Sequence, residues 1–373
     1  MVASSALPEP SDHGLMAAGS LLSSSVLFIA GVATVAVGAG LGVRRLLLEG
    51  ATVVAVAGLS VLVAGLVLLV VAGRLLWRRV RGRRRLWFVP VVMVSLVGAW
   101  SVMFAVMVTV VPATPLDQRS VGSLPATYRD VHLTAGDGVV LSAWWAPPSQ
   151  GAAIVLLHGS GENRSSTLAA ASVLMRHGYG VLLLDARGHG DSAGAGMDLG
   201  WFGNSDVGAA IAFLRDEPSV DASRIGVLGL SMGGEEAIGA AAAYPQIRAV
   251  VAEGAKSRTA EDKAAWLPGG VAGAVQRVID RVTYGLVDGL TPAGPPIPLR
   301  DAVVRAPDAR ILLIAAGTSR DEQDAAAAIR SVAPDPVSVW TVSGATHTGG
   351  LHAAPSEWEN RVIAFFDAAL TTP

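Results

Sequence analysis

A serine between two glycines stands out in Gly229-Leu-Ser-Met-Gly233, and an apolar run that begins at Arg224 leads into it. An Ala-rich run, Glu235–Ala243, follows. This is the G-x-S-x-G pattern, in which a tight turn between a strand and a helix holds the serine exposed. Such a turn leaves little room for a Cβ beside the serine, which explains the glycines. The pattern predicts that Ser231 is a nucleophile for acyl transfer.

A serine hydroxyl is a weak nucleophile and needs a base, a group that orients the base, and donors for an oxyanion. Where this elbow occurs, the acid and then the histidine follow the serine along the chain. Of the seven histidines, only His347 and His352 follow Ser231. His347 comes directly after the last apolar run, where a loop would present a base, so we expect His347 to be the base. We interpret His352 as a pocket or surface histidine.

The acid is expected on the loop that follows the preceding apolar run, Arg310–Ala315. This loop holds three carboxylates within four positions. We expect Asp321 to be the acid. Glu322 and Asp324 are close alternatives, since acids in such a place also stabilise the first turn of a helix. Glu253, directly after the sixth apolar run, Ala249–Ala252, is a further candidate.

The oxyanion would be held by two backbone N–H groups. One comes from the residue after the serine, Met232, and the other from a loop after an earlier strand. That loop is Leu157–Asn163, rich in small residues, and its Ser160 amide is the expected second donor. His158 precedes the elbow along the chain and is expected to be structural.

The elements that must position these residues alternate between short β-branched runs and Ala-rich helical runs, which predicts a mostly parallel sheet. Asp137-Gly138 marks a hairpin turn between the first two strands. Eight strands in this order, with the first pair antiparallel, predict the α/β-hydrolase fold, with helices on both faces of the sheet and a small cap. The expected strands are Tyr128–Thr134, Val139–Ala146, Ala152–Leu157, Gly180–Leu184, Arg224–Leu230, Ala249–Ala252, Arg310–Ala315 and Ser338–Val342.

The first third of the chain has a different character. Three apolar stretches, at about 21–42, 51–73 and 87–111, are each long enough to cross a membrane. Gly38 and Gly42 form a G-x-x-x-G pair, which occurs at helix packing faces and also by chance in Ala/Gly-rich helices. We therefore expect a membrane domain at 1–112, a linker at 113–124, and a catalytic domain at 125–373 whose cap covers about 256–305.

Arginine predicts the orientation of the three spans. The second loop carries seven arginines, against two in the first loop, and basic loops stay cytoplasmic. The N-terminus would then be cytoplasmic and the catalytic domain extracytoplasmic, on a multi-pass protein of the cell membrane. The seven are Arg74, Arg78, Arg79, Arg81, Arg83, Arg84 and Arg85.

Composition narrows the functional classes. Residues 1–112 hold nine Arg and three acids, a charge of +6, and residues 113–373 hold 19 Lys and Arg against 27 acids, a charge of −8. An acidic globular part gives no support to nucleic-acid binding, which needs a basic patch. The chain contains no Cys, which excludes disulfides, thiolate metal sites and a cysteine nucleophile. The dominance of Arg over Lys and the abundance of Ala and Gly fit a GC-rich bacterial genome.

Three segments make residues from about Leu124 to Leu370 resemble the α/β-hydrolase superfamily, and its dienelactone-hydrolase, serine-aminopeptidase and prolyl-oligopeptidase-like group above all. The segments are Leu156-Leu-His-Gly-Ser-Gly161, Leu184-Asp-Ala-Arg-Gly-His-Gly-Asp-Ser192 and Gly229-Leu-Ser-Met-Gly-Gly234, and His347 completes the likeness. The resemblance implies a serine hydrolase with no metal or organic cofactor. In this family a Gly often stands three positions before the acid, whereas Gly317 and Asp321 are four apart.

The resemblance does not specify a substrate, because this fold hosts esterases, lipases, thioesterases, amidases and peptidases. The apolar cap and the membrane domain favour a small-molecule or lipid-like ester as the substrate and the lipid bilayer as a partner. A peptidase or amidase of the same fold is the first alternative. A non-catalytic hydrolase-like domain on a membrane signalling or transport module is the second, although the spans lack the internal ionisable residues that such functions require.

Overall fold

The computed structural model describes residues 12–80, 82–116 and 128–370. The chain divides into two compact units, Met1–Met107 and Val108–Pro373. Most of the predicted linker at 113–124 lies outside the described residues.

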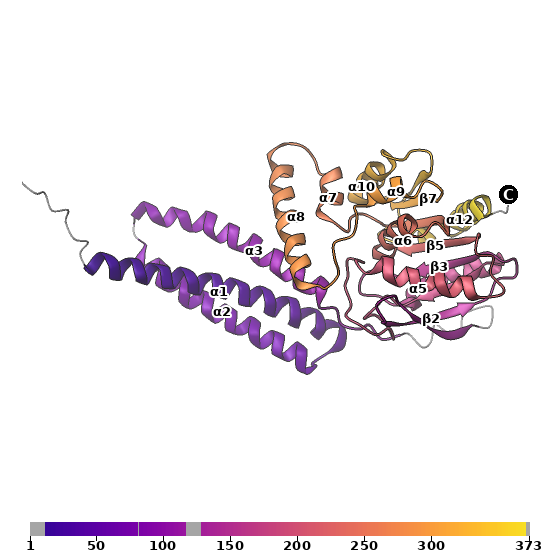
Figure 1. Cartoon of the computed structure of the whole chain (residues 1–373). Helices are drawn as coiled ribbons and strands as arrows, with labels where there is room; N and C mark the ends of the chain where they lie inside the picture. The colour runs from indigo at the N-terminus through magenta and orange to yellow at the C-terminus, as the bar shows by residue number, and fades with distance from the viewer. Residues whose placement is uncertain (1–11, 81, 117–127, 371–373) are drawn as a thin grey trace, which may run out of the picture. The chain divides into compact units, whose positions relative to one another are not determined.

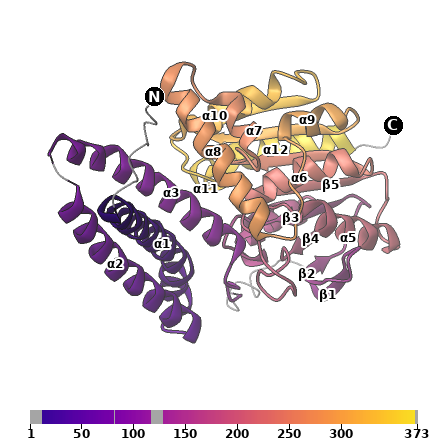
Figure 2. The same cartoon turned by 60° about the vertical axis from the view of Figure 1, so that its left-hand side comes forward.

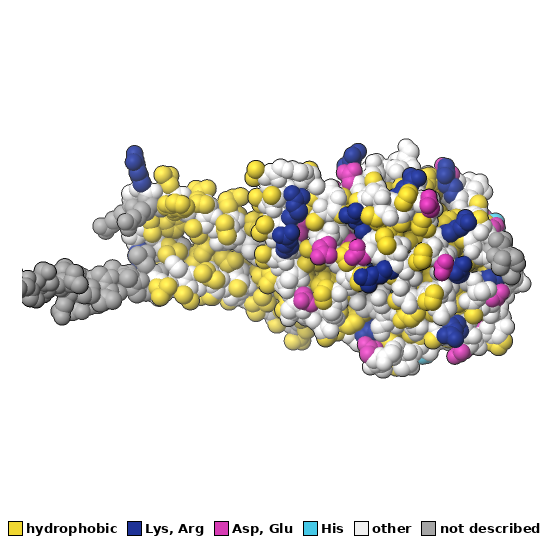
Figure 3. All heavy atoms as spheres, turned by 45° about the horizontal axis from the view of Figure 1, so that its top comes forward, with side chains coloured by type: hydrophobic (Ala, Val, Ile, Leu, Met, Phe, Trp, Pro, Cys, Tyr) yellow, Lys and Arg dark blue, Asp and Glu magenta, His cyan; other side chains and the backbone are white. Residues whose placement is uncertain are grey.

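Three long helices make up the first unit: α1 (Asp12–Glu49), α2 (Val53–Arg79) and α3 (Phe88–Thr109), with a short 3₁₀ helix, η1 (Gly82–Trp87), before α3. Each contains a segment long and apolar enough to cross a membrane: Leu22–Leu47, Val53–Arg79 and Arg85–Thr109. Hydrophobic side chains cover most of the visible surface of these helices (Figure 3).

Helices α1 and α2 form a close hairpin through small residues. A Cβ on Gly58 would lie 2.5 Å from the Gly42 amide nitrogen, and one on Gly38 would lie 2.3 Å from the Leu62 amide nitrogen. A Cβ on Gly65 would lie 2.6 Å from the backbone of Val35. The G-x-x-x-G pair is therefore a packing face, because only glycine lets the two backbones approach this closely.

The second unit is built on one eight-stranded sheet with the order β1-β2-β4-β3-β5-β6-β7-β8. Strand β2 runs antiparallel to both β1 and β4, and every other pair is parallel. The strands are β1 (Arg129–Thr134), β2 (Val140–Ala146), β3 (Ala153–Leu157), β4 (Gly180–Leu184), β5 (Ile225–Leu230), β6 (Ile247–Glu253), β7 (Arg310–Ala316) and β8 (Val337–Val342). All eight expected strands and the predicted fold class are confirmed.

Helices cover both faces of this sheet (Figures 1 and 2). The side chains of α5 (Gly203–Asp216), α6 (Met232–Ala243), α9 (Leu299–Arg305) and α10 (Arg320–Arg330) join one apolar core. Those of η3 and α4 (Arg164–Thr167, Leu168–Arg176) and of α11 and α12 (Gly350–Ala353, Pro355–Leu370) border the other. Strands β3 and β4 are buried along their whole length, as expected for parallel strands covered on both faces.

Two helices between β6 and β7, α7 (Ala260–Trp266) and α8 (Gly270–Leu290), occupy the segment expected to be the cap. The third helix of that segment, α9, does not belong with them. Its Leu299, Ala302 and Val303 are buried in the same core as α6. The part of the segment that stands outside the two helix layers is therefore shorter than 256–305.

Candidate active site

Ser231 occupies the turn between β5 and α6 in a strained conformation. Its φ and ψ are 52° and −115°, a region that residues with a side chain rarely adopt. A Cβ on Gly229 would come within 2.1 Å of the Gly233 carbonyl oxygen, and a Cβ on Gly233 within 2.5 Å of the Leu157 carbonyl oxygen. The backbone N–H of Ser231 donates to the Glu253 carbonyl at 2.7 Å. Gly229 is therefore required by the turn itself, and Gly233 by the close approach of the end of β3.

His347 lies beside this serine, on the loop that follows β8. Its Nε2 is 2.8 Å from Ser231 Oγ. The next residue, Thr348, also has a positive φ of 53°, so the backbone turns sharply just after the histidine. The His347 side chain is 45% exposed, which leaves room for a substrate to reach it. The structure thus brings together the expected nucleophile and the expected base.

Glu322, not Asp321, is the carboxylate that contacts this histidine. Glu322 Oε1 lies 2.8 Å from His347 Nδ1, and its Oε2 accepts the Ala316 N–H at 2.8 Å. Helix α10 begins at Arg320, and successive helical residues point about 100° apart. Glu322 is therefore turned inward and buried, whereas Asp321 is exposed. The choice of Asp321 is corrected to Glu322, and Asp324 forms an exposed ion pair with Arg320 at 3.0 Å.

The environment of Glu322 keeps its carboxyl group ionised. Burial raises its pKa, but the hydrogen bonds with His347 and the Ala316 amide outweigh burial and leave the pKa below its ordinary value. A carboxylate only accepts, so His347 Nδ1 carries the hydrogen and donates it to Glu322. The Nε2 atom is then an acceptor facing the Ser231 hydroxyl. This is the tautomer that a general base needs.

Glu253, the further candidate for the acid, has another task. Its Oε1 accepts the Gly350 N–H at 2.7 Å and its Oε2 accepts the Trp358 indole N–H at 3.0 Å. Burial raises the pKa of this carboxyl. Within the described residues, no hydrogen bond joins it to His347. Glu253 instead ties the turn after His347 to α12, a positioning role that sequence reasoning missed.

The expected oxyanion donors, Met232 and Ser160, belong to two segments that adjoin Ser231. Met232 is the first residue of α6, and the loop after β3 approaches the serine so closely that a Cβ on Gly159 would lie 3.5 Å from Ser231 Cβ. In that loop, the Gly159 N–H donates to Glu162 at 3.1 Å and the Gly161 N–H donates to Asp198 at 2.9 Å. These two bonds hold the loop on both sides of the exposed Ser160.

His158, on the same loop, is structural, as its position before the elbow suggested. It is buried, and its Nε2 accepts the Ala186 N–H at 3.1 Å, so its Nδ1–H donates to the Gly159 carbonyl at 2.8 Å. Burial and the neighbouring His189 lower its pKa to about 3. A neutral His158 therefore shapes the loop and moves no proton. His352, on α11, is exposed.

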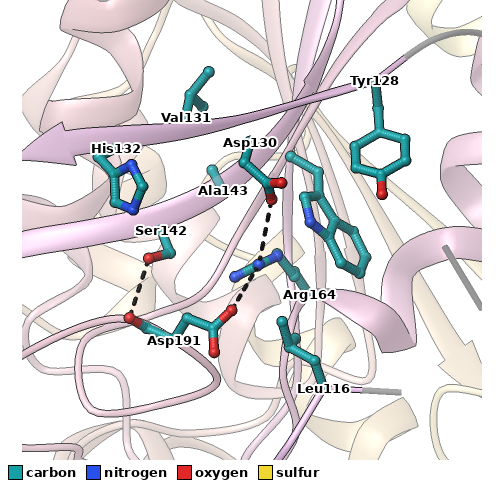
Figure 4. Close-up of a pocket in the computed structure, with 10 residues that line it drawn as sticks. Leu116, Tyr128, Asp130, Val131, His132, Ser142, Ala143, Arg164 and Asp191 are labelled. Atoms are coloured by element: carbon teal, nitrogen blue, oxygen red, sulfur yellow. Dashed lines mark hydrogen bonds and ion pairs between the residues drawn. The ribbon is translucent and has the colours of Figure 1, made fainter. Parts of the chain in front are cut away.

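A polar cavity of about 440 Å³ lies away from these residues, against β1 and β2. Figure 4 shows Arg164 between Asp130 and Asp191, at 3.8 and 3.0 Å. The same guanidinium pairs with the buried Asp185 and stacks 4.5 Å from the Trp144 ring centroid. The charges gathered here hold the loop after β4 in place. The cavity adjoins Leu116 and Tyr128, which flank residues outside the described ranges.

Comparison with known proteins agrees with this architecture. Residues 148–324 match the family model described as serine aminopeptidase, S33. The protein YfhR of Salmonella typhi is 29% identical over 130 residues, which cover 33% of this chain and 44% of YfhR. The thiohydrolase aneE of Aspergillus aculeatus is 32% identical over 129 residues, covering 34% of this chain and 41% of aneE. The chain thus spans less than half the length of these curated relatives.

The esterase Pf2001 of Pyrococcus furiosus shares the fold, with a TM-score of 0.54 and 24% identity, covering 70% of this chain and 99% of that chain. The order of the strands and the turn that carries Ser231 are those of the α/β-hydrolase fold. The second unit therefore has the α/β-hydrolase fold, and residues 148–324 resemble the S33 serine aminopeptidase family.

Proposed function

We propose that this protein is a membrane-anchored serine hydrolase that cleaves an ester through an acyl-serine intermediate. One observation carries the proposal: two hydrogen bonds of 2.8 Å connect Ser231 Oγ to His347 Nε2 and His347 Nδ1 to Glu322 Oε1. This is the relation between nucleophile, base and orienting acid that acyl transfer needs. A non-catalytic domain has no need to hold these three side chains together from three separate segments: the turn after β5, the first turn of α10 and the loop after β8.

The chemistry follows from the positions of the protons. His347 Nε2 takes the hydroxyl proton as Ser231 Oγ attacks the substrate carbonyl carbon, and the ionised Glu322 stabilises the imidazolium that forms. The amides of Met232 and Ser160 would donate to the oxyanion. His347 then gives the proton to the departing alcohol oxygen, which leaves an acyl-serine. A water molecule, deprotonated by the same nitrogen, then attacks the acyl carbon. The carboxylic acid leaves as Ser231 Oγ takes the proton back from His347.

The ester preference rests on the setting of the site and on the relatives. The relative aneE is named a thiohydrolase, and the structural neighbour Pf2001 an esterase, and both names agree with hydrolysis of an acyl bond. Three candidate membrane spans would hold the enzyme beside lipid-like esters. The S33 model supports a second candidate, cleavage of a peptide or amide by the same residues.

Fluorophosphonate labelling of the full chain in detergent tests the nucleophile. Wild type should be labelled and Ser231→Ala should lose labelling. Ser331→Ala, which alters an exposed serine at the C-terminal end of α10, should be labelled as wild type is. Equal labelling of Ser231→Ala would refute the proposal.

A substrate panel then separates the two candidates. Wild type is assayed on p-nitrophenyl esters of increasing chain length and on amino-acid p-nitroanilides. Turnover of the esters supports the first candidate. Turnover of an anilide with no ester hydrolysed would establish the peptidase reaction instead.

The proposed location places the N-terminus in the cytoplasm and the hydrolase unit outside the cell membrane, because seven arginines cluster between Arg74 and Arg85, where the second span ends and the third begins. Fusion of alkaline phosphatase after Leu116 should give phosphatase activity in intact cells. A fluorescent cytoplasmic reporter fused at the same residue should then stay dark, and the reverse pair of results would invert the orientation.

A further inference from the structure

Helix α8, the orange helix labelled in Figure 1, exposes a row of large apolar side chains. Among the described residues of the second unit, nine large apolar side chains are exposed, and six of them lie on this one helix. The six are Val271, Val275, Val278, Val282, Leu286 and Leu290. They recur every three or four residues, so they form a single stripe along the helix, which we call the α8 stripe.

The opposite side of α8 faces the protein and buries two polar residues, Asp280 and Thr283, together with Val287. Asp280 is only 4% exposed, and it accepts from Lys263 Nζ at 2.7 Å and from Gln276 Nε2 at 3.0 Å. A helix on the surface of a water-soluble protein shows the reverse arrangement, with its apolar stripe toward the core. The α8 stripe therefore requires an apolar environment outside the hydrolase unit.

The chain connectivity indicates which apolar environment is near. The third candidate span ends at Thr109, and the hydrolase unit begins at Val108. The Val108 carbonyl already accepts the Asp198 N–H at 2.8 Å, inside that unit. Since a residue extends the chain by at most about 3.6 Å, this bond keeps Asp198 within a few residues' reach of the end of the third candidate span.

The composition of α8 indicates how it meets a bilayer. Its 21 residues make it about 31 Å long, but Arg277, Asp280, Arg281 and Asp288 interrupt it, and it is not among the three candidate spans. A large apolar face on a helix with charged residues beside it is typical of a helix that lies in the membrane interface. The exposed Arg281 borders Val282 in the stripe and would lie at the level of the lipid phosphates.

We propose that α8 is an interfacial helix whose stripe inserts into the acyl-chain boundary of the bilayer that anchors this protein. The inference rests on the proposed anchoring and is independent of hydrolase activity. It gives the cap segment a lipid surface as its partner, in addition to any role in covering the substrate.

Depth-dependent quenching in the full chain tests the proposal, and the absence of Cys makes single-cysteine labelling specific. A fluorophore is attached to Val278→Cys on the stripe, to Val63→Cys in the second span, and to Asp335→Cys on an exposed turn before β8. Each protein is reconstituted in vesicles of phosphatidylcholine with a minor fraction of phosphatidylglycerol. Quenching by a nitroxide on the lipid acyl chain is compared with quenching by aqueous iodide.

The proposal expects the probe at position 278 to behave like the one at 63. Its ratio of lipid to iodide quenching should exceed that at position 335 by at least about fivefold. A probe at 278 that iodide reaches as easily as at 335 would overturn the proposal, because the stripe would then face water. Protection of 278 from both quenchers would also overturn it, because the protein's own helices or a second copy would then cover the stripe.

The controls separate this inference from the others. Fluorophosphonate labelling of Val278→Cys equal to that of wild type shows that the hydrolase unit is folded. If wild type is not labelled at all while 278 is quenched from the lipid, the proposed catalysis fails and the interfacial helix stands. If lipid nitroxide fails to quench the probe at 63, the anchoring is refuted and the interfacial helix with it.

Discussion

Glu322 Oε1 lies 2.8 Å from His347 Nδ1, while the neighbouring Asp321 is exposed at the first turn of the same helix. One position along α10 decides whether a carboxylate contacts the histidine or the solvent. The second oxygen of Glu322 is fixed by the Ala316 N–H at the end of β7, so the acid is held by the sheet as well as by the helix.

Replacement of the two acids should therefore have very different effects. Glu322→Gln removes the charge that stabilises the imidazolium and disfavours the tautomer in which Nε2 accepts. We expect kcat on a soluble p-nitrophenyl ester to fall by about 10³- to 10⁴-fold, as for an Asp-to-Asn change in a related triad. Asp321→Asn should stay within about twofold of wild type, in line with a surface substitution. A severe loss in Asp321→Asn with an active Glu322→Gln would contradict the assignment.

The sequence alone predicts that Ser231 and His347 lie together, because each has few competitors, and the two side chains are 2.8 Å apart. The elbow pattern is local, and chain order leaves two histidines. The acid could not be chosen in this way, because three carboxylates lie within four positions. Which of them turns inward depends on the residue at which the helix begins, and the sequence does not determine that residue. The role of Glu253 was also out of reach, because the Gly350 and Trp358 donors that it binds lie about 100 residues further along the chain.

Helix α8 shows the same limit in another form. Its apolar period is visible in the sequence, and both a packed cap and a lipid contact agree with it. Only the fold shows that Asp280 is buried while Val278 is exposed. Periodicity identifies a face but not the partner of that face.

The elbow glycines should be far less tolerant than glycines elsewhere. In Gly229→Ala the new methyl group would meet the Gly233 carbonyl, so we expect loss of fluorophosphonate labelling and a lower thermal midpoint. Gly285→Ala on α8 adds the same methyl group where no atom lies within 4 Å. That variant should keep labelling and gain about 0.5–1 kcal/mol of stability from helix propensity. Full labelling of Gly229→Ala would show that the turn is less tight than described.

A buried carboxyl on α6 should make stability depend on pH. Burial, and next the nearby Asp206, raise the pKa of Glu236 to about 8 from its ordinary value of 4.5. The folded protein then binds this proton more tightly than the unfolded chain does. The stabilisation of the folded state that this proton provides is complete below about pH 4.5 and is lost as the pH rises through about 8.

Glu236→Gln mimics the protonated form and should remove this dependence. As the pH rises from 5 to 8, the free energy of unfolding of wild type should fall by on the order of 3 kcal/mol relative to that of the variant. Thermal unfolding of the full chain in detergent across this range measures the trend. Glu261→Gln, at an exposed acid on α7, should follow the wild-type curve. Parallel curves for Glu236→Gln and wild type would show that Glu236 is ionised in the folded protein.

The α1–α2 hairpin should depend on Gly58 and not on Gly98. In Gly58→Ala the methyl carbon would lie 2.5 Å from the Gly42 backbone, whereas in Gly98→Ala nothing lies within 4 Å. Both variants gain the same helix propensity, so their difference isolates the clash, which should cost about 1–3 kcal/mol. Ala72→Cys supplies a single thiol in the buried face of α2, and its reaction with a maleimide as dodecyl sulfate is added reports opening of the hairpin. If the thiol reacts at the same dodecyl sulfate concentration in both variants, α1 and α2 do not pack through Gly58. If the concentration for half-maximal reaction is lowered only in Gly58→Ala, they do.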